Sequence, residues 1–403
     1  MILCATGWAE SVSVAFGYRA AIPSMGPEVG RPTRGASVSS AVDRDGVTAR
    51  DADVSQSATG YDRSPATAAP QMVRLGVVGL GQMGRHHARV ASRLEGIELV
   101  GGVDPLGDVH RSLAGHAWFG DLEEALDEGI DAAIVAIPSE FHEKAALRLA
   151  EAGVHALIEK PIAPDSAAAM RVRDAFKSSG LIAGVGHVER YNPALQEMKR
   201  RLEAGALGRV IAVETERVGP YPLRIRDVGV VHDLATHDID IVLWLCGAID
   251  EMNVQAASRL AGPHEDLVEV VGRLEDGTVL SMSVNWLTPT KRRRVTVLGE
   301  RGALVADLLS ADVSFFSNGS VPLEWEEMAR LKGVSEGDMI RYAVRKREPL
   351  QVELENFRDA ILGRPDAEIV TLDHGVAIME VADRMLDAAL TSLGSALGGG
   401  GAP

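Results

Sequence analysis

A glycine-rich hexapeptide has the residue types and spacing to bind a phosphate; its residues are Gly79, Leu80, Gly81, Gln82, Met83 and Gly84. It directly follows the apolar residues 74–78 and directly precedes the helical pattern of residues 85–94. In that context the first glycine allows a tight turn, the second lets the backbone approach a pyrophosphate, and the third lets helix and strand pack closely. The N–H groups and dipole of the helix start attract the anion. The motif therefore predicts a dinucleotide-binding loop, although glycine-rich turns without a ligand share the spacing.

Asp104 indicates which dinucleotide binds. It ends the next strand-like run, 20 residues after Gly84, where a carboxylate accepts hydrogen bonds from ribose hydroxyls and repels a 2′-phosphate. Residues 105–107 contain no arginine or lysine that would compensate this charge. We therefore predict NAD as the cofactor, with an aspartate that caps a helix as the alternative reading of this position.

A lysine and an aspartate–histidine pair have the types needed for acid–base chemistry. Lys160, in Glu159-Lys160-Pro161, closes a strand at the sheet edge where ligands of such folds bind. A lysine there can bind a substrate oxygen and stabilise a developing alkoxide, although a surface cation is the alternative. Asp233 and His237 lie four residues apart and would share one face of a helix. His237 can take a hydroxyl proton as hydride leaves the same carbon, while Asp233 orients the substrate or the base.

The same region also contains enough acidic and imidazole side chains to resemble a metal cluster, formed by His232, Asp233, His237, Asp238 and Asp240. Hydride transfer to a nicotinamide needs no metal, so we predict none. Two other histidines, His142 and His187, either line the cofactor cleft or serve as packing residues. We have no functional account of His232.

Four motifs together resemble the glucose-fructose oxidoreductase/inositol dehydrogenase/rhizopine catabolism family (Gfo/Idh/MocA), over residues 72 to about 393. They are the glycine loop, residues 138–142 after a strand, residues 159–161 and residues 233–238. The resemblance implies a Rossmann domain followed by an α+β domain with a large open, mainly antiparallel sheet, whose exposed face commonly makes a dimer or tetramer contact. It also implies Lys160, Asp233 and His237 as the catalytic group. The expected cofactor contacts are Gly79, Gly81, Gln82, Met83, Gly84, Asp104, Pro138, His142, Glu159 and Lys160.

Two stretches, residues 186–194 and 217–231, resemble the branch of this family that oxidises UDP-N-acetylglucosamine at C3. A UDP-sugar carries a pyrophosphate, to which arginines in both stretches can offer fork-shaped donors, whereas free inositol would not need them. The expected substrate contacts are Arg190, Tyr191, Asn192, Arg224 and Arg226. Ion pairing of these arginines with Asp227 or Glu189 inside the chain is the alternative.

The predicted activity is therefore NAD-dependent oxidation of a sugar secondary hydroxyl to a ketone, at C3 of UDP-N-acetylglucosamine. An inositol or free-sugar dehydrogenase of the same family is the alternative enzyme. A non-catalytic NAD-sensing protein is the alternative of another class, but it has no need for Lys160 and His237. A scaffolding subunit, in turn, has no need for an intact glycine loop.

The elements that must position these residues alternate between short apolar and longer amphipathic runs over residues 72–190. This alternation is typical of a Rossmann domain, a parallel sheet covered by helices. The predicted strands span residues 74–78, 98–103, 132–137, 154–158 and 181–186. One predicted helix follows Ser139 as N-cap and ends at Gly153. Another follows Asp165 and ends at Gly180, each glycine being a left-handed closing residue.

Residues 191–393 form the second domain, which we assign to substrate binding and oligomerisation. Strand-like runs occupy residues 210–218, 268–274, 279–286 and 294–298. Their succession with turns between them predicts a sheet-dominated α+β domain. Helical periodicity returns over residues 352–362 and after Thr371.

The two ends of the chain carry no such pattern. Residues 1–71 are rich in Ala, Ser, Gly, Asp and Arg without a sustained period, so we predict a disordered extension, unless translation begins at Met72. Residues 394–403 are predicted to be a flexible tail.

Composition narrows the class of partners. The chain has 41 basic and 57 acidic residues, a net charge of −16 that repels phosphate backbones and anionic lipid surfaces. The basic run at residues 291–294 is interpreted as a solvated strand end. Two distant cysteines exclude a disulfide framework, and no segment has the length of a membrane span or the features of a signal peptide. We therefore expect a cytoplasmic homodimer or homotetramer that acts on a small molecule, without nucleic acid or membrane.

Overall fold

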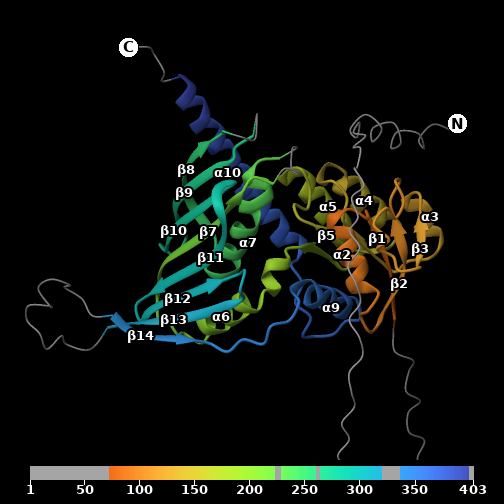
Figure 1. Cartoon of the computed structure of the whole chain (residues 1–403). Coiled ribbons are helices and arrows are strands. Elements are labelled where there is room, and N and C mark those ends of the chain that lie inside the picture. The colour runs from red at the N-terminus through yellow and green to blue at the C-terminus, as the bar shows by residue number, and fades with distance from the viewer. Residues whose placement is uncertain (1–71, 223–227, 260–263, 320–335, 399–403) are drawn as a thin grey trace, which may run out of the picture. The chain divides into compact units, whose positions relative to one another are not determined.

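The computed structural model describes residues 72–222, 228–259, 264–319 and 336–398 (Figure 1). These residues contain two β-sheets, a six-stranded sheet followed along the chain by an eight-stranded sheet. The extension predicted for residues 1–71 lies outside the described residues.

The first sheet is a doubly covered parallel sheet. Its elements are β1 (Val73–Val78), α2 (Gln82–Ala91), β2 (Ile97–Val103), β3 (Ala117–Phe119), α3 (Leu122–Asp127), β4 (Ala132–Val135), η1 (Ser139–Phe141), α4 (His142–Glu151), β5 (His155–Glu159), α5 (Ser166–Ser179) and β6 (Ala183–Gly186). The strand order is β3-β2-β1-β4-β5-β6, and every neighbouring pair is parallel. The predicted Rossmann fold is therefore confirmed.

Burial on both faces explains why the strands of this sheet are continuous apolar runs. Along β4, Ala132 and Ile134 join one hydrophobic cluster with helices α2 and α9. The alternating Ala133 and Val135 join a second cluster with α4, α5 and α10. Because neighbouring residues of a strand point to opposite faces, both sides of the sheet must be apolar.

Local signals predicted some element ends correctly and others wrongly. Asp165 is an N-cap, with its carboxylate accepting from the Ala168 N–H at 2.8 Å, and Gly180 closes α5 with φ +64°. Ser139 is not the N-cap of α4, because it starts the 3₁₀ turn η1 and α4 begins only at His142. Strand β3 was not predicted; it has three residues and lies at the sheet edge, which leaves too short a pattern.

The second sheet is open and mainly antiparallel, as predicted. Elements of this region are η2 (Val188–Tyr191), α6 (Pro193–Glu203), β7 (Val210–Pro220), η3 (Val231–Ala235), α7 (Thr236–Leu245), β8 (Ile249–Ala257), β9 (Leu267–Leu274), β10 (Val279–Asn285), β11 (Leu287–Gly299), β12 (Gly302–Asp307), β13 (Asp312–Asn318) and β14 (Glu336–Arg341). The strand order is β14-β13-β12-β11-β7-β10-β9-β8, and only β7 and β10 pair in parallel.

The two last helices do not respect the predicted boundary between the domains. Helix α9 (Pro349–Ile361) buries Leu350, Leu354 and Phe357 in the cluster that contains β1 and α2, so it belongs to the core of the first sheet. Helix α10 (Leu372–Gly398) packs its first turns into the core of the first sheet and its later turns into the core of the second sheet. It continues to Gly398, so the tail predicted from residue 394 does not begin there.

The glycine loop joins β1 to α2 with little space to spare. Gly79 has φ +92°, and a Cβ added there would lie 2.5 Å from the Ala136 carbonyl oxygen. A Cβ on Gly84 would lie 1.8 Å from the Gly79 carbonyl oxygen, whereas a Cβ on Gly81 would meet nothing within 4 Å. The first and third glycines are thus required by the fold itself. Gly81, the N-cap of α2, is instead a backbone position open to an approaching ligand.

Two substitutions separate these roles. Gly84→Ala is expected to lower the free energy of unfolding by about 1–3 kcal/mol or more through overpacking, as measured by denaturant unfolding.

Gly81→Ser supplies a favourable N-cap in open space, so it should leave the free energy of unfolding nearly unchanged. It should weaken NAD binding at least about tenfold by keeping the backbone away from the pyrophosphate. Wild-type NAD affinity in Gly81→Ser would contradict the assignment of the loop.

Candidate active site

Asp104 lies at the end of β2 beside the glycine loop. Its carboxylate accepts the Leu80 N–H and the Leu106 N–H, each at 2.9 Å. The first bond ties Asp104 to the loop, and the second orders its own turn. A carboxylate oxygen has two lone pairs, so both oxygens retain acceptor capacity for ribose hydroxyls. The loop, with its open Gly81, and this half-buried carboxylate fit a nicotinamide dinucleotide.

Two of the predicted cofactor contacts are used inside the protein instead. The buried Glu159 lies 2.7 Å from Nε2 of the fully buried His87, and it also accepts the Lys160 N–H. Burial opposes its ionisation, but the hydrogen bond and charge of His87 lower the pKa of Glu159 overall. The His142 ring nitrogens lie 2.8 Å from the carbonyl oxygens of Pro161 and Ile137. Glu159 and His142 are therefore both held by hydrogen bonds within the protein, and His87 is a partner that no sequence motif indicated.

The structure brings Lys160 and Asp233 together across 73 positions of sequence. Lys160 Nζ donates to the Asp233 carbonyl oxygen at 2.7 Å and lies 3.3 Å from its Oδ1. Both side chains keep a small exposed fraction, 17% and 15%. The predicted single helix through Asp233 and His237 is wrong in detail, because Asp233 lies in the π-helical turn η3 and His237 in the first turn of α7. Such turns are frequent at functional sites.

His237 is half-buried, and the charges that act most strongly on its ring are those of cations. Its ring makes an edge contact with the His187 ring, with centroids 6.2 Å apart. Burial, together with the charges of Lys160 and Arg217, holds the pKa of His237 well below its usual 6.5. The ring is therefore neutral near pH 7, and Nδ1 has no hydrogen-bond partner among the described residues. A neutral imidazole with a vacant nitrogen is able to accept a proton.

Buried ion pairs surround His237. Arg217 on β7 donates to Asp238 Oδ2 at 3.0 Å and to Glu189 Oε1 at 2.9 Å. Burial raises the pKa of Asp238 to about 6 even with this guanidinium beside it. Arg190 binds Asp240 through Nε at 2.8 Å and Nη2 at 2.6 Å. The pairs connect α7 to β7 and η2, so they fix the helix that carries His237.

The residues predicted to bind substrate after β6 all form hydrogen bonds within the protein. Arg190 is occupied by Asp240, neither of the carboxylates expected as its internal partner. Tyr191 Oη donates to the Glu368 carbonyl at 3.0 Å. Asn192 caps α6 through the Ala194 N–H and donates to the Leu308 carbonyl. These three side chains are buried. The other two predicted residues, Arg224 and Arg226, lie outside the described residues.

In the part of the chain that the structure describes, no group of three or more His, Cys, Asp or Glu side chains is arranged to hold a metal ion. His232 is mostly buried, and burial lowers its pKa. Within the same ranges, no helix has the length and apolarity needed to cross a membrane.

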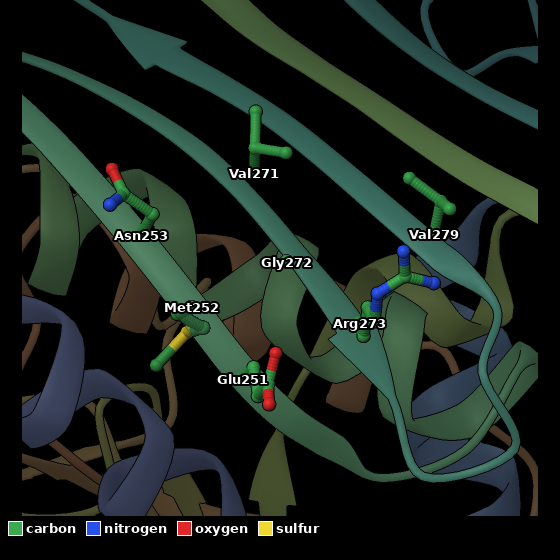
Figure 2. A pocket seen from close by; sticks show the side chains of 7 residues that line it. All are labelled: Glu251, Met252, Asn253, Val271, Gly272, Arg273 and Val279. Atoms are coloured by element: carbon green, nitrogen blue, oxygen red, sulfur yellow. The ribbon is translucent and has the colours of Figure 1, made fainter.

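The second sheet carries a hollow, and Figure 2 shows the side chains that line it. It is lined by Glu251, Met252, Asn253, Val271, Gly272, Arg273 and Val279 from β8, β9 and β10. Val279 pairs with Ala212 of β7 and therefore points to the face opposite Arg217. Val271 is 63% exposed. This hollow is a feature of the outer face, with none of the predicted catalytic residues in its lining.

Comparison with known proteins agrees with this geometry. Residues 73–187 match the oxidoreductase family model with an NAD-binding Rossmann fold (GFO_IDH_MocA), and residues 195–305 match a GFO/IDH/MocA C-terminal domain. The chain is 28% identical to UDP-N-acetylglucosamine 3-dehydrogenase from Acidithiobacillus ferrooxidans over 72% of this chain and 88% of that protein. It is 34% identical to scyllo-inositol 2-dehydrogenase (NAD(+)) from Bacillus subtilis over 44% of this chain and 54% of that protein.

The same fold is found in a solved structure, that of UDP-N-acetylglucosamine 3-dehydrogenase GnnA from Acidithiobacillus ferrooxidans. The TM-score is 0.69 and the identity 24%, over 80% of this chain and 99% of that one. Both family models match in the order in which the two sheets occur along the chain. The protein therefore belongs to the Gfo/Idh/MocA family, as an NAD-dependent oxidoreductase that acts on sugar-like hydroxyls.

Proposed function

We propose that this protein oxidises the C3 hydroxyl of UDP-N-acetylglucosamine with NAD. The observation that carries the proposal is the pairing of Lys160 with Asp233 beside the neutral His237. The similarity to a UDP-N-acetylglucosamine 3-dehydrogenase over 88% of that protein's length supports the substrate. The finer identity of the sugar is thus proposed by analogy, and the acid–base roles are proposed from the residues themselves.

The glycine loop and Asp104 are the residues that would hold the cofactor. NAD, when bound, supplies the acceptor for the hydride that leaves the sugar carbon. The N-terminus of α2 faces the loop with its unpaired N–H groups, because Gly81 provides no capping side chain. These groups and the helix dipole stabilise the pyrophosphate. Gln82 and Met83, in the first turn of α2, remain proposed contacts, as does Pro138 after β4.

Lys160 is proposed to bind the oxygen of the reacting hydroxyl. An ammonium group has three donors, and two of them are directed at Asp233. The third is left for the substrate, so the lysine is oriented by Asp233 and presents one donor. A fixed donor at this position stabilises the negative charge that develops on the oxygen during oxidation.

His237 is proposed to take the hydroxyl proton. As the O–H bond breaks, its electron pair would form the carbonyl while the hydride leaves the carbon, for which bound NAD would be the acceptor. The low pKa of His237, caused by burial and by Lys160 and Arg217, keeps the ring available as a base near pH 7. The products are the 3-keto sugar, NADH and one proton, which His237 then passes to solvent.

An inositol dehydrogenase is the second candidate. It is favoured by the 34% identity to the scyllo-inositol enzyme of Bacillus subtilis, although that match spans 54% of the relative. The acid–base steps would be the same, because both substrates present a secondary alcohol. The candidates differ in whether the site must accommodate an anionic nucleotide.

We also propose a homodimer or homotetramer formed through the outer face of the second sheet. Apolar side chains are exposed there on several strands: Val271 63%, Leu298 41%, Phe316 43% and Met339 59%. Contiguous exposed apolar surface marks interaction sites. A cytoplasmic location is proposed as well, because Cys246 is a free thiol, as is usual for proteins of reducing compartments.

A substrate panel tests the proposed function. Purified protein should form NADH from NAD with UDP-N-acetylglucosamine, and it should do so poorly from NADP because Asp104 repels a 2′-phosphate. The panel includes myo-inositol, scyllo-inositol and free N-acetylglucosamine as neutral substrates, with absorbance of the reduced cofactor as readout. NADH formation with an inositol but with no nucleotide sugar would replace the first candidate by the second.

Substitution of the acid–base residues tests the mechanism. Lys160→Met and His237→Gln should each lower turnover at least about a hundredfold, as expected for loss of a proton-transfer or charge-stabilising group. NAD affinity should stay nearly unchanged, since neither side chain belongs to the glycine loop. Lys144→Met, an exposed lysine of α4, is the matched control and should keep normal turnover. Normal turnover in both test variants would remove the mechanism.

The pH profile tests the state of His237. The base must be neutral to work, so kcat/KM is constant above its pKa and falls as the pH drops through it. Because that pKa lies below 6.5, the acid limb should lie below pH 6.5. Removing the charge of Lys160 favours the imidazolium and so raises the pKa of His237. The acid limb of the residual activity of Lys160→Met should therefore lie at a higher pH than that of the wild type. An acid limb above pH 6.5 in the wild type would argue against His237 as the base.

A further inference from the structure

Arg293 lies on the inner face of the second sheet, directly opposite Arg217. Strands β7 and β11 are antiparallel, and their register pairs Arg217 with Arg293. Paired residues of neighbouring strands point to the same face. Arg217 is buried against Asp238 on α7, so Arg293 faces the same side as the helix that carries His237. Like charges placed directly opposite destabilise a sheet unless anions lie nearby.

The carboxylates beside this pair are taken up by Arg217. Glu189 and Asp238 both bind its guanidinium, at 2.9 and 3.0 Å. Arg293 is only partly exposed, and Nη1 donates to the carbonyl oxygens of Val218 and Arg292. Within the described ranges no carboxylate forms an ion pair with Arg293. Its Nε and Nη2 groups make no hydrogen bond there either.

The charge of Arg293 reaches the proposed acid–base group. It contributes to the lowered pKa of His237. The charge of Asp233 in turn raises the pKa of Arg293, although less than burial and Arg217 lower it. Burial and the neighbouring Arg217 lower the pKa of Arg293 to about 10, which still leaves it charged near pH 7. A partly buried cation without an anionic partner is costly. A ligand anion at this place would remove that cost.

The rest of the basic run behaves differently. Lys291, Arg292 and Arg294 are exposed, and Arg292 pairs with Glu216 across the strands, with Nε 2.8 Å from Oε1. Neighbouring side chains of β11 point to opposite faces of the sheet, so Arg292 and Arg294 point to the outer face. The interpretation of the run as a solvated strand end holds for these three residues and fails for Arg293.

We propose that Arg293 binds the diphosphate of the nucleotide-sugar substrate, close to the carbon that is oxidised. The inference rests on the proposed function and assigns it a residue for substrate specificity. In a UDP-sugar the diphosphate is attached at C1, only a few bonds from C3, so it must lie near the base that acts on C3. A guanidinium whose Nε and Nη2 nitrogens are unused offers the fork that binds phosphate oxygens in pairs. A neutral inositol gives this cation no partner.

The test measures binding of UDP to the enzyme–NADH complex by calorimetry, with kcat/KM for UDP-N-acetylglucosamine as the second readout. Arg293→Gln should weaken UDP about ten- to a hundredfold, as loss of a charge-assisted hydrogen bond does. Arg293→Lys keeps the charge without the fork, so its affinity for UDP should lie between those of the wild type and Arg293→Gln. Arg292→Gln, the neighbour on the outer face, is the matched control and should bind UDP normally. Rates are compared on the pH plateau, because removing Arg293 also raises the pKa of His237.

NADH affinity separates the two diphosphates that could be bound. It should be the same in all variants, and a loss of NADH affinity in Arg293→Gln would assign the residue to the cofactor instead and overturn the proposal. Equal UDP binding by wild type and Arg293→Gln, equal losses in Arg292→Gln, or no UDP binding by the wild type would also overturn it.

The outcomes distinguish this inference from the proposed function. If the wild type oxidises UDP-N-acetylglucosamine and Arg293→Gln is unchanged, the function stands and the role of Arg293 is wrong. If UDP binds through Arg293 but no nucleotide sugar is oxidised, the substrate assignment is wrong and the anion site stands.

Discussion

Pairing of buried charges is the constraint on which the layer between the two sheets depends. A charge taken out of water destabilises a protein unless a partner and hydrogen bonds compensate it. Four such sets lie in and around the candidate site: His87 with Glu159, Lys160 with Asp233, Arg190 with Asp240, and Arg217 with Glu189 and Asp238. Because each set joins different elements, satisfying the charges also fixes α7 against β7 and η2, α2 against β5, and η3 against the residue that follows β5.

The pairing also produces the electrostatic character of the site. Asp238 adjoins His237 in sequence, but its carboxylate is directed at Arg217 and does not stabilise an imidazolium. The net influence on His237 is therefore cationic, and the ring stays neutral. Glu353 on α9 is the contrasting case: its carboxyl oxygens have no partner in the described part of the chain. Burial, with Glu159 and Asp240 nearby, raises the pKa of Glu353 well above its usual 4.5, opposite to the shift of His237 toward the neutral ring.

Much of the fold was predictable because its signals are local. The strands of the first sheet are buried on both faces, which makes them continuous apolar runs. The spacing of the glycines in the loop reflects the backbone conformation that the loop needs. The second sheet was predicted in part. Strand β8 exposes much of its length and β13 is half polar, so neither forms a clear alternating pattern. No local signal predicted that α9 packs into the core of the first sheet, since its apolar face would fit the core of either sheet.

The sequence by itself determined the glycine loop, Asp104 and the order of the two domains, because each follows from backbone conformation or from neighbours within a few residues. Only the tertiary structure decided which polar side chains remain free for ligands. Arg190 finds its partner 50 residues away and Tyr191 finds its acceptor 177 residues away, and Lys160 meets Asp233 across 73. A hydrogen-bonding group has the same chemistry whether it binds substrate or another segment of the chain. Its role is settled by what the folded chain brings within reach.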